Sequence, residues 1–288
     1  MKIRKAVIPA AGYGTRFLPM TKASPKEMLP IVDKPIIQYV VEEAVASGIE
    51  DIIIVTGSNK RAIEDHFDHN LELENYLESV GKLKELEEIR KIAQMANFVY
   101  VRQKGPYGNG TPILNVENVV GKEPFAVLWG DEFIYSNPPR LKQMIEVWDK
   151  FGEPVISAMR VPKNSLSKYG IAKVKNVEEK VFEIEEIVEK PNPEEAPSDL
   201  ALLGAYILTP DIFEAMKNIN PGKGGEIWLT DGINAIKNNH KIYAREIENG
   251  KYYDTGNKLE YLKANVDFAL KRDDIREEFR EYIKTVQS

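Results

Sequence analysis

An apolar run at residues 3–8 leads straight into a turn with two glycines, Gly12–Arg16. The run alternates poorly between apolar and polar side chains, which is typical of a strand covered on both faces, as in a parallel sheet. Glycine lets a backbone approach a ligand closely and direct N–H groups at it. The junction therefore predicts an α/β sheet with a ligand-binding turn at the carboxyl end of its first strand.

Cations and a hydroxyl accompany this turn. Arg16 can form a fork of hydrogen bonds to phosphate, whereas Lys22 and Lys26 supply compact positive charges. Thr15 contributes the hydroxyl. The combination predicts a nucleoside triphosphate site, and a strand-to-helix turn with surface lysines is the alternative.

Two phosphate-binding motifs are absent from the sequence. Phe17 stands where the dinucleotide fingerprint has its third glycine. The nearest approach to Gly-x4-Gly-Lys-[Ser/Thr] is the segment 105–111, where Thr111 replaces the lysine. The P-loop is thus excluded, and a dinucleotide-dependent oxidoreductase becomes a remote alternative.

Strands and helices alternate over the first half of the chain. Apolar runs predict strands at residues 3–8, 51–56, 98–101 and 125–129. Amphipathic stretches predict helices from Pro35 to Gly48 and, in two or three pieces, over residues 59–94. This order indicates a doubly wound, mostly parallel (Rossmann-like) sheet, with residues 1–150 as a nucleotide-binding half.

The rhythm changes after about residue 150. Short turns separate predicted strands at residues 155–161, 171–177, 181–188 and 201–208. Helices near residues 210–217 and 228–238 and a strand at 241–247 follow. We expect residues 151–256 to form an antiparallel extension and residues 257–288 a C-terminal helical segment, all within a single domain spanning residues 1–288.

Composition narrows the class of protein. Apolar residues make up 43% of the 288 residues, which is enough for a large core, and 39 basic against 45 acidic residues give a net charge of −6. Both signs are interspersed, which argues against nucleic acid or a membrane surface as a partner. There are no cysteines and no apolar run of membrane-spanning length. We expect a cytoplasmic protein.

Further polar residues follow predicted strands or occupy short turns. Asp131 and Asp254 are each suited to hold Mg²⁺, although a turn or helix-cap role is the commoner use of such a residue. Glu189 and Lys190 close another strand, where a solvated edge is the alternative. Gln103 precedes a loop with three glycines, which suits the edge of a flat base, or is a plain polar loop.

Taken in order, these segments resemble the nucleoside-diphosphate-sugar pyrophosphorylases, and among them the bacterial-type UTP–glucose-1-phosphate uridylyltransferases. The likeness extends over nearly the whole chain. The segments that carry it are Gly12–Pro19, Thr21–Lys22, Pro25–Pro30, Val101–Gln103, Asp131, Lys168–Gly170, Glu189–Pro191, Gly225–Asp231 and Tyr253–Gly256.

The resemblance implies a nucleotidyltransferase that condenses UTP with glucose 1-phosphate to UDP-glucose and pyrophosphate, by Mg²⁺-dependent in-line attack on the α-phosphorus. Arg16 and Lys26 would be the catalytic residues, and Asp131 and Asp254 the ligands of Mg²⁺. The implied nucleotide-binding residues are Ala11, Gly12, Gly14, Thr15, Glu27, Gln103 and Gly108. The implied sugar-phosphate-binding residues are Gly170, Glu189, Lys190 and Gly204. The resemblance also implies a homodimer or homotetramer.

Two segments depart from the family pattern. Residues 108–112 read Gly-Asn-Gly-Thr-Pro where the family usually has Gly-Leu-Gly-His-Ala, and residues 128–130 read Leu-Trp-Gly where it commonly has Leu-Pro. Both lie near the expected base, so a glucose-1-phosphate thymidylyltransferase using dTTP is the nearest alternative. A non-catalytic nucleotide-sugar-binding module and a glycosyltransferase are the others. Asp131–Phe133 lacks the Asp-x-Asp of the latter.

Overall fold

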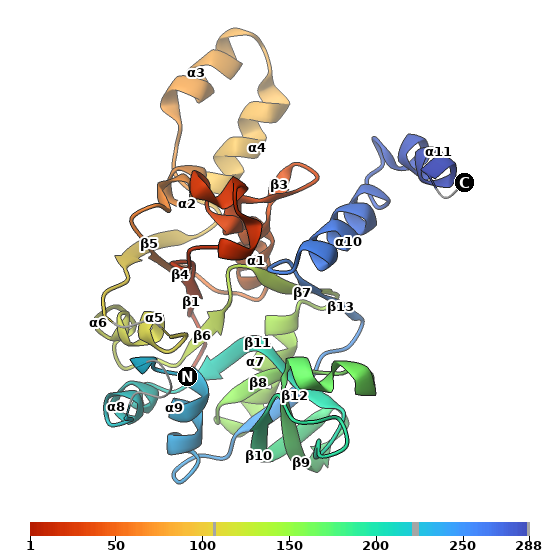
Figure 1. Ribbon diagram of the computed structural model, residues 1–288. Helices are drawn as coiled ribbons and strands as arrows, with labels where there is room; N and C mark the ends of the chain where they lie inside the picture. The colour runs from red at the N-terminus through yellow and green to blue at the C-terminus, as the bar shows by residue number, and fades with distance from the viewer. Residues whose placement is uncertain (106–107, 221–224, 287–288) are drawn as a thin grey trace.

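A nine-stranded sheet organises the molecule (Figure 1). The structure, a computed structural model, describes residues 1–105, 108–220 and 225–286. From one edge to the other, the strands are β5 (Asn97–Arg102), β4 (Asp51–Thr56), β1 (Lys5–Pro9), β6 (Phe125–Leu128), β11 (Leu200–Leu208), β8 (Val155–Arg160), β12 (Tyr243–Glu246), β10 (Val181–Glu189) and β9 (Gly170–Glu178).

The first four strands are parallel to one another, which confirms the sequence-based expectation for this half. Alternate residues of β1 enter different cores: Ala6 and Ile8 belong to one hydrophobic cluster and Val7 to the other. Both faces of the strand are therefore covered, and this is why its sequence is nearly continuously apolar.

The second half of the chain extends the same sheet. β11 pairs antiparallel with β6 and joins the two halves. The expectation of an antiparallel extension is correct for the pairs β8–β11, β9–β10, β9–β11 and β10–β12. It is wrong for one pair, because β12 lies parallel to β8. Helices α8 (Asp211–Lys217) and α9 (Leu229–Ile236) precede β12 and give the chain room for the crossover that a parallel pair needs.

Helices cover both faces of the sheet. On one face lie α1 (Ile36–Ala46) and α7 (Arg140–Phe151), and on the other lie α5 (Thr111–Leu114), α6 (Glu117–Val120), α8 and α9. The predicted elements do not include α7, although Leu141, Met144 and Trp148 are buried at helical spacing. The charged stretch at residues 59–94 forms three pieces, as expected: α2 (Arg61–His66), α3 (Leu71–Ser79) and α4 (Leu83–Gln94).

A separate two-stranded ribbon brings distant residues together. β7 (Glu132–Ser136) pairs antiparallel with β13 (Gly250–Asp254), with Glu132 opposite Asp254. Neither strand was among the predicted elements, because each is short and its partner lies far away in the sequence. The register places Asp254 beside Asp131, which directly precedes β7.

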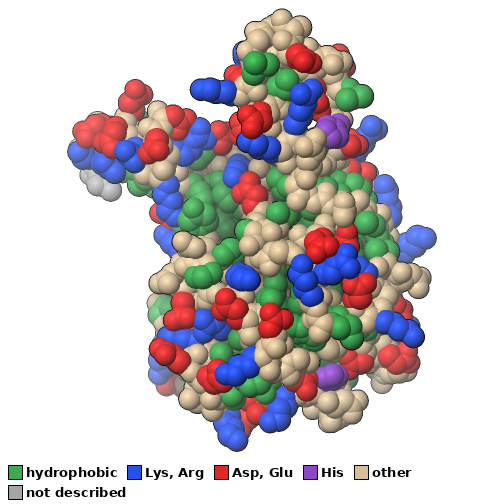
Figure 2. All heavy atoms as spheres, turned by 180° about the vertical axis from the view of Figure 1, so that it is seen from behind, with side chains coloured by type: hydrophobic (Ala, Val, Ile, Leu, Met, Phe, Trp, Pro, Cys, Tyr) green, Lys and Arg blue, Asp and Glu red, His purple; other side chains and the backbone are tan. Residues whose placement is uncertain are grey.

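The C-terminal helices form an arm that extends from the body (Figures 1 and 2). Helix α10 (Lys258–Ala269) docks on the short hairpin of β2 (Pro30–Ile31) and β3 (Lys34–Pro35): the Tyr261 hydroxyl donates to the Pro30 carbonyl at 2.8 Å. Helix α11 (Arg276–Val286) has no buried residue. In the described part of the chain, no helix has the length and apolar character needed to span a bilayer.

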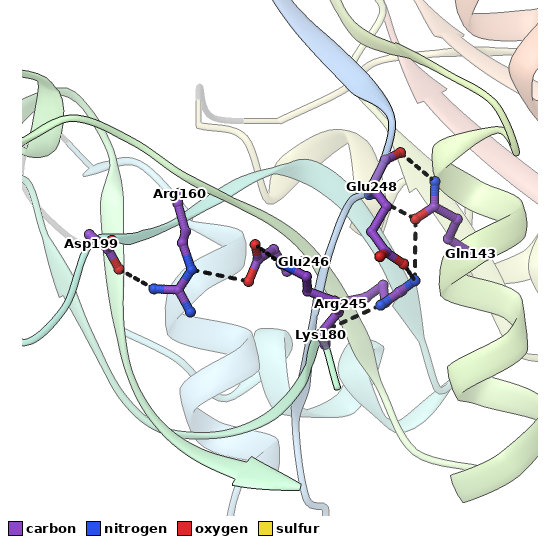
Figure 3. Close-up of polar contacts among 7 residues, drawn as sticks. All are labelled: Gln143, Arg160, Lys180, Asp199, Arg245, Glu246 and Glu248. Atoms are coloured by element: carbon purple, nitrogen blue, oxygen red, sulfur yellow. Dashed lines mark hydrogen bonds and ion pairs between the residues drawn. The ribbon is translucent and has the colours of Figure 1, made fainter. Parts of the chain in front are cut away.

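Charged side chains of both signs are interspersed over the face shown in Figure 2. In the second half, an ion-pair network ties the sheet to its neighbouring turns (Figure 3). The Glu246 carboxylate on β12 contacts Arg160 at 3.2 Å and Lys180 at 2.8 Å. From α7, the Gln143 amide donates to the Glu248 carbonyl at 3.1 Å. These contacts fix the β8–β12–β10 region against α7.

Candidate active site

The turn after β1 folds back over the segment that carries Lys26. Gly14 adopts φ +67°, and a Cβ atom there would lie 3.0 Å from the Cβ of Lys26 and 3.2 Å from Cγ2 of Thr21. The Thr21 hydroxyl donates to the Gly14 carbonyl at 2.7 Å. Glycine is therefore required at position 14 both for its backbone conformation and for the close approach. Thr15 begins a single helical turn, Thr15–Phe17, and Lys26 begins another, Lys26–Met28.

Lys26 extends beneath this turn to the end of β6. Its Nζ lies 2.5 Å from Oδ2 of Asp131, and a Cβ atom at Gly12 would lie 3.8 Å from the same Nζ. Burial alone lowers the pKa of Lys26, but the charges of Asp131 and Glu27 and the hydrogen bond to Asp131 together outweigh it and raise this pKa above its ordinary value. The lysine is therefore held as a cation facing both the turn and the aspartate.

Three charged groups converge at Gly256. A Cβ atom there would lie 3.1 Å from Oδ1 of Asp254, 3.2 Å from Oδ2 of Asp131 and 3.3 Å from Nη1 of Arg16. The Thr255 hydroxyl donates to the Asp131 carbonyl at 2.5 Å, which fixes the two segments together. Burial raises the pKa of Asp254, and the facing charge of Asp131 raises it further. Two carboxylates that repel each other in this way suit a shared cation.

Two cavities meet at these groups. The phosphate-loop cavity, of about 250 Å³, is lined by Gly12–Phe17, Lys26, Asp131 and Gly256. The large cavity, of about 700 Å³, opens over the second half of the sheet and includes Gly170, Glu189, Lys190 and Gly204. Arg16 and Asp131 line both, so one molecule in each cavity would meet between them.

Comparison with known proteins shows the family of the chain. The sequence model described as nucleotidyl transferase matches residues 5–270. The chain belongs to the nucleotidyl transferase family. It is 50% identical over 285 residues to the UTP–glucose-1-phosphate uridylyltransferase YngB of Bacillus subtilis (strain 168), covering 99% of this chain and 96% of that protein.

Other relatives point the same way. The UTP–glucose-1-phosphate uridylyltransferase 2 of Staphylococcus saprophyticus is 49% identical, with 99% of each chain covered. A crystal structure of UDP-glucose pyrophosphorylase complexed with UDP-glucose has a TM-score of 0.85 and 46% identity, covering 94% of this chain and 100% of that one. A UTP-bound UGPase from Acinetobacter baumannii has a TM-score of 0.91 and 39% identity, with 98% of each chain covered.

Most site residues predicted from sequence line one of the two cavities of this nucleotidyl transferase. Four of them line neither cavity: Ala11, Glu27, Gln103 and Gly108. Gln103 follows β5, and its backbone N–H donates to the Thr56 carbonyl at 2.9 Å. At Gly108, φ is +126° and a Cβ atom would lie 2.3 Å from the Ile227 carbonyl oxygen. Gly108 therefore lies close to the backbone of Ile227 within the chain itself. Residues 106–107 of the same loop lie outside the described residues.

Glu27 forms a buried ion pair. Its Oε2 lies 2.7 Å from Nζ of Lys60, and both side chains are 1% exposed. Burial raises the pKa of Glu27, while the charge of Lys60 opposes the rise. Because Glu27 belongs to the Lys26–Met28 turn and Lys60 precedes α2, the pair ties that turn to the start of α2. Sequence reasoning did not identify Lys60. It precedes α2 in a charged stretch, where its sequence position does not distinguish it from a surface lysine.

The transferase also has cavity residues that are absent from the predicted set. The Glu132 Oε2 atom accepts from the Tyr252 hydroxyl at 2.6 Å, and burial raises the pKa of Glu132 to about 7. A Cβ atom at Gly204 would lie 1.8 Å from Glu132 Oε1 and 1.9 Å from Trp129 Cδ1, so only glycine fits there. Trp228 lines the same cavity. Trp228 lies in the Gly225–Asp231 segment that carries the family resemblance, and Tyr252 directly precedes the Tyr253–Gly256 segment. An aromatic residue in or beside such a segment was the signal that could have identified both as cavity residues.

Proposed function

We propose that the chain is a UTP–glucose-1-phosphate uridylyltransferase, which forms UDP-glucose and releases pyrophosphate. The observation that carries the proposal is the convergence of Arg16, Lys26, Asp131 and Asp254 where the two cavities meet. Both substrates are anions, so their reaction requires positive charge at that junction.

The relatives support the choice of substrates. The proteins about 50% identical over the full chain are UTP–glucose-1-phosphate uridylyltransferases, and two of the matched structures hold UDP-glucose and UTP. A glucose-1-phosphate thymidylyltransferase structure from Bacillus anthracis is more distant, with 25% identity and a TM-score of 0.70. We therefore favour UTP over dTTP despite the unusual 108–112 segment.

We propose Mg²⁺ as the cofactor. In the described residues, no group of three or more His, Cys, Asp or Glu side chains is placed to hold a metal ion. The Asp131 and Asp254 carboxylates are hard oxygen donors, and Mg²⁺ commonly takes one or two such ligands with the rest supplied by water and phosphate. They therefore fit this ion. When bound, Mg²⁺ would supply neutralisation of phosphate charge at the reacting centre.

The chain's own residues perform two tasks. Arg16 and Lys26 neutralise the departing pyrophosphate, and the Gly12–Arg16 turn directs its backbone toward the triphosphate. On the other side, Gly170 and Glu189 contact glucose and Lys190 binds the sugar phosphate. Holding both substrates in line supplies much of the acceleration in phosphoryl-type transfer.

No general base is needed, because a sugar phosphate is already ionised at neutral pH. The three histidines are occupied elsewhere in the described structure. His66 pairs with Gln38 at 3.0 Å and His69 with Glu74 at 2.7 Å. His240 lies between the carboxylates of Glu153 and Asp211.

We also propose that the enzyme acts in the cytoplasm as a homodimer or homotetramer. The C-terminal arm supports the assembly, since α10 exposes Leu259 by 60% and Leu262 by 59%, and α11 exposes Tyr282 by 62%. Large apolar side chains on one projecting segment suit an interface.

We further propose that residues 1–150 form a doubly wound, Rossmann-like sheet, which the parallel strand order β5-β4-β1-β6 supports.

A pyrophosphate-release assay tests the function directly. The purified chain is incubated with Mg²⁺ and a grid of nucleoside triphosphates and sugar 1-phosphates. We expect the highest kcat/KM with UTP and glucose 1-phosphate. Higher activity with dTTP would favour the thymidylyltransferase, and no release with any pair would refute the proposal in favour of a binding module.

A further inference from the structure

The large cavity is unusually rich in aromatic side chains. Five line it: Trp129, Tyr169, Tyr206, Trp228 and Tyr252. Trp129 packs edge-on against Tyr206 with ring centroids 6.0 Å apart, and Tyr169 packs edge-on against Tyr252 at 6.2 Å. Four of the five therefore already have aromatic partners within the protein.

Trp228 is the exception. It is 38% exposed, and among the residues that the structure describes its indole ring has no aromatic partner and its N–H no acceptor. An exposed indole leaves a large apolar surface in water, which is unfavourable unless a ligand covers it. Its position in a cavity wall makes a small molecule the natural partner.

The backbone on both sides of Trp228 is fixed. The Ile227 carbonyl accepts from the Gly110 N–H at 2.9 Å, and the Leu229 N–H donates to Oδ1 of Asn109 at 2.8 Å. Leu229 and Ile233 anchor α9 in the core with no exposed surface. The indole is thus attached to a rigid segment, so little ordering entropy is lost when a ligand packs on it.

We infer that Trp228 is an aromatic platform for the hexose ring of the sugar 1-phosphate and contributes to selection of the sugar. A pyranose presents C–H groups on its faces and hydroxyls at its rim. The C–H groups pack well on the electron-rich face of an indole. The same cavity offers Glu189 and Lys190 for polar groups, so the two kinds of contact complement each other. This inference rests on the proposed function.

The hexose is favoured over the base because of where Trp228 lies. It lines the large cavity together with Gly170, Glu189 and Lys190, the residues assigned to the sugar phosphate. Asn109, from the 108–112 segment expected near the base, lines the same cavity, so the pyrimidine is the competing occupant. Stacking on the pyrimidine is the outcome that would overturn the inference.

Kinetics provide the first test. In Trp228→Ala, we expect the KM for glucose 1-phosphate to rise about fivefold to tenfold, with the KM for UTP unchanged. Trp228→Phe keeps an aromatic face and should recover most of the loss. Tyr76→Ala removes a ring of 58% exposure on the distant α3 and is the matched control. A rise in the UTP KM instead, or no change in either KM, overturns the inference.

Tryptophan fluorescence provides a second test that needs no turnover. The chain has three tryptophans, and Trp148 is buried with its indole N–H donating to the Met1 carbonyl. UDP-glucose should change the emission of the wild type, whereas UDP, which lacks the hexose, should not. The difference should vanish in Trp228→Phe and persist in Trp129→Phe, whose indole lines the same cavity. An equal response to both ligands, or the reverse pattern in the two variants, overturns the inference. If the wild type releases no pyrophosphate, the proposed function is refuted. The fluorescence titration measures binding without turnover, so it still decides the role of Trp228.

Discussion

The phosphate-loop cavity and the large cavity share Arg16 and Asp131, yet they are built in different ways. The first is made chiefly by the contiguous turn Gly12–Phe17, with a buried ion pair in the adjoining Lys26–Met28 turn. The second is assembled from strand ends and turns scattered along the chain from Arg16 to Asp254, and its walls include five aromatic side chains. The cavity proposed for the polyphosphate therefore depends on local backbone and charge, whereas the cavity proposed for the sugar depends on side chains that only folding brings together.

The largest expected effect comes from breaking the buried Glu27–Lys60 ion pair next to the phosphate-loop cavity. Lys60→Met leaves the Glu27 carboxylate buried without its partner, which should lower the free energy of unfolding by about 3–5 kcal/mol. Urea unfolding measures this. The double variant Lys60→Met/Glu27→Gln should recover most of the stability, and Lys122→Met, at an exposed position, is the control. A stable single variant would show that this cavity does not depend on the pair.

The next effect concerns chemistry in the phosphate-loop cavity. Lys26→Ala removes the cation that contacts Asp131 and, in the proposed reaction, neutralises the departing pyrophosphate. We expect kcat to fall by about 10²–10³-fold, as for loss of a preorganised charge-stabilising group. The thermal midpoint should stay near that of Lys122→Ala. Normal turnover in Lys26→Ala would refute its catalytic role.

A smaller effect is expected in the large cavity. Lys190→Ala should raise the KM for glucose 1-phosphate by about tenfold to a hundredfold, because a charge-assisted contact with its phosphate is lost. Initial rates at varied UTP should show an unchanged KM for the nucleotide. Lys175→Ala on β9 is the matched exposed control. If UTP binding weakens instead, the two cavities are assigned in reverse.

The smallest expected effect is on thermal stability and comes from His240, which lines neither cavity. Its replacement should change stability without changing activity. His240 contacts Glu153 at 2.7 Å and Asp211 at 2.8 Å. Burial alone lowers the pKa of His240, but its bond to Glu153 and the charge of Asp211 raise this pKa above its ordinary value. The imidazolium therefore stabilises the fold below about pH 6.5, and this stability is lost as the pH rises through the raised pKa.

Thermal melts between about pH 5 and pH 9 check the sign. His240→Gln should lower the midpoint by about 1–2 °C at acid pH, because the pair is partly exposed, and should have little effect at alkaline pH. The turnover number should be unchanged throughout. A difference that grows with pH would contradict the assigned protonation.

The sequence by itself determined the parallel strands β1, β4, β5 and β6 and the chemistry of the Gly12–Arg16 turn, because hydrophobic runs and glycine turns act over a few residues. It also singled out Asp131 and Asp254 as suited to Mg²⁺ from their places after a strand and in a short turn, and the family resemblance assigned them as its ligands. Tertiary structure decided that these two aspartates meet, because the β7–β13 pairing that joins them is long-range. It likewise decided that Glu27 pairs with Lys60 in the interior and that Trp228 faces a cavity, since burial depends on what the rest of the chain places nearby.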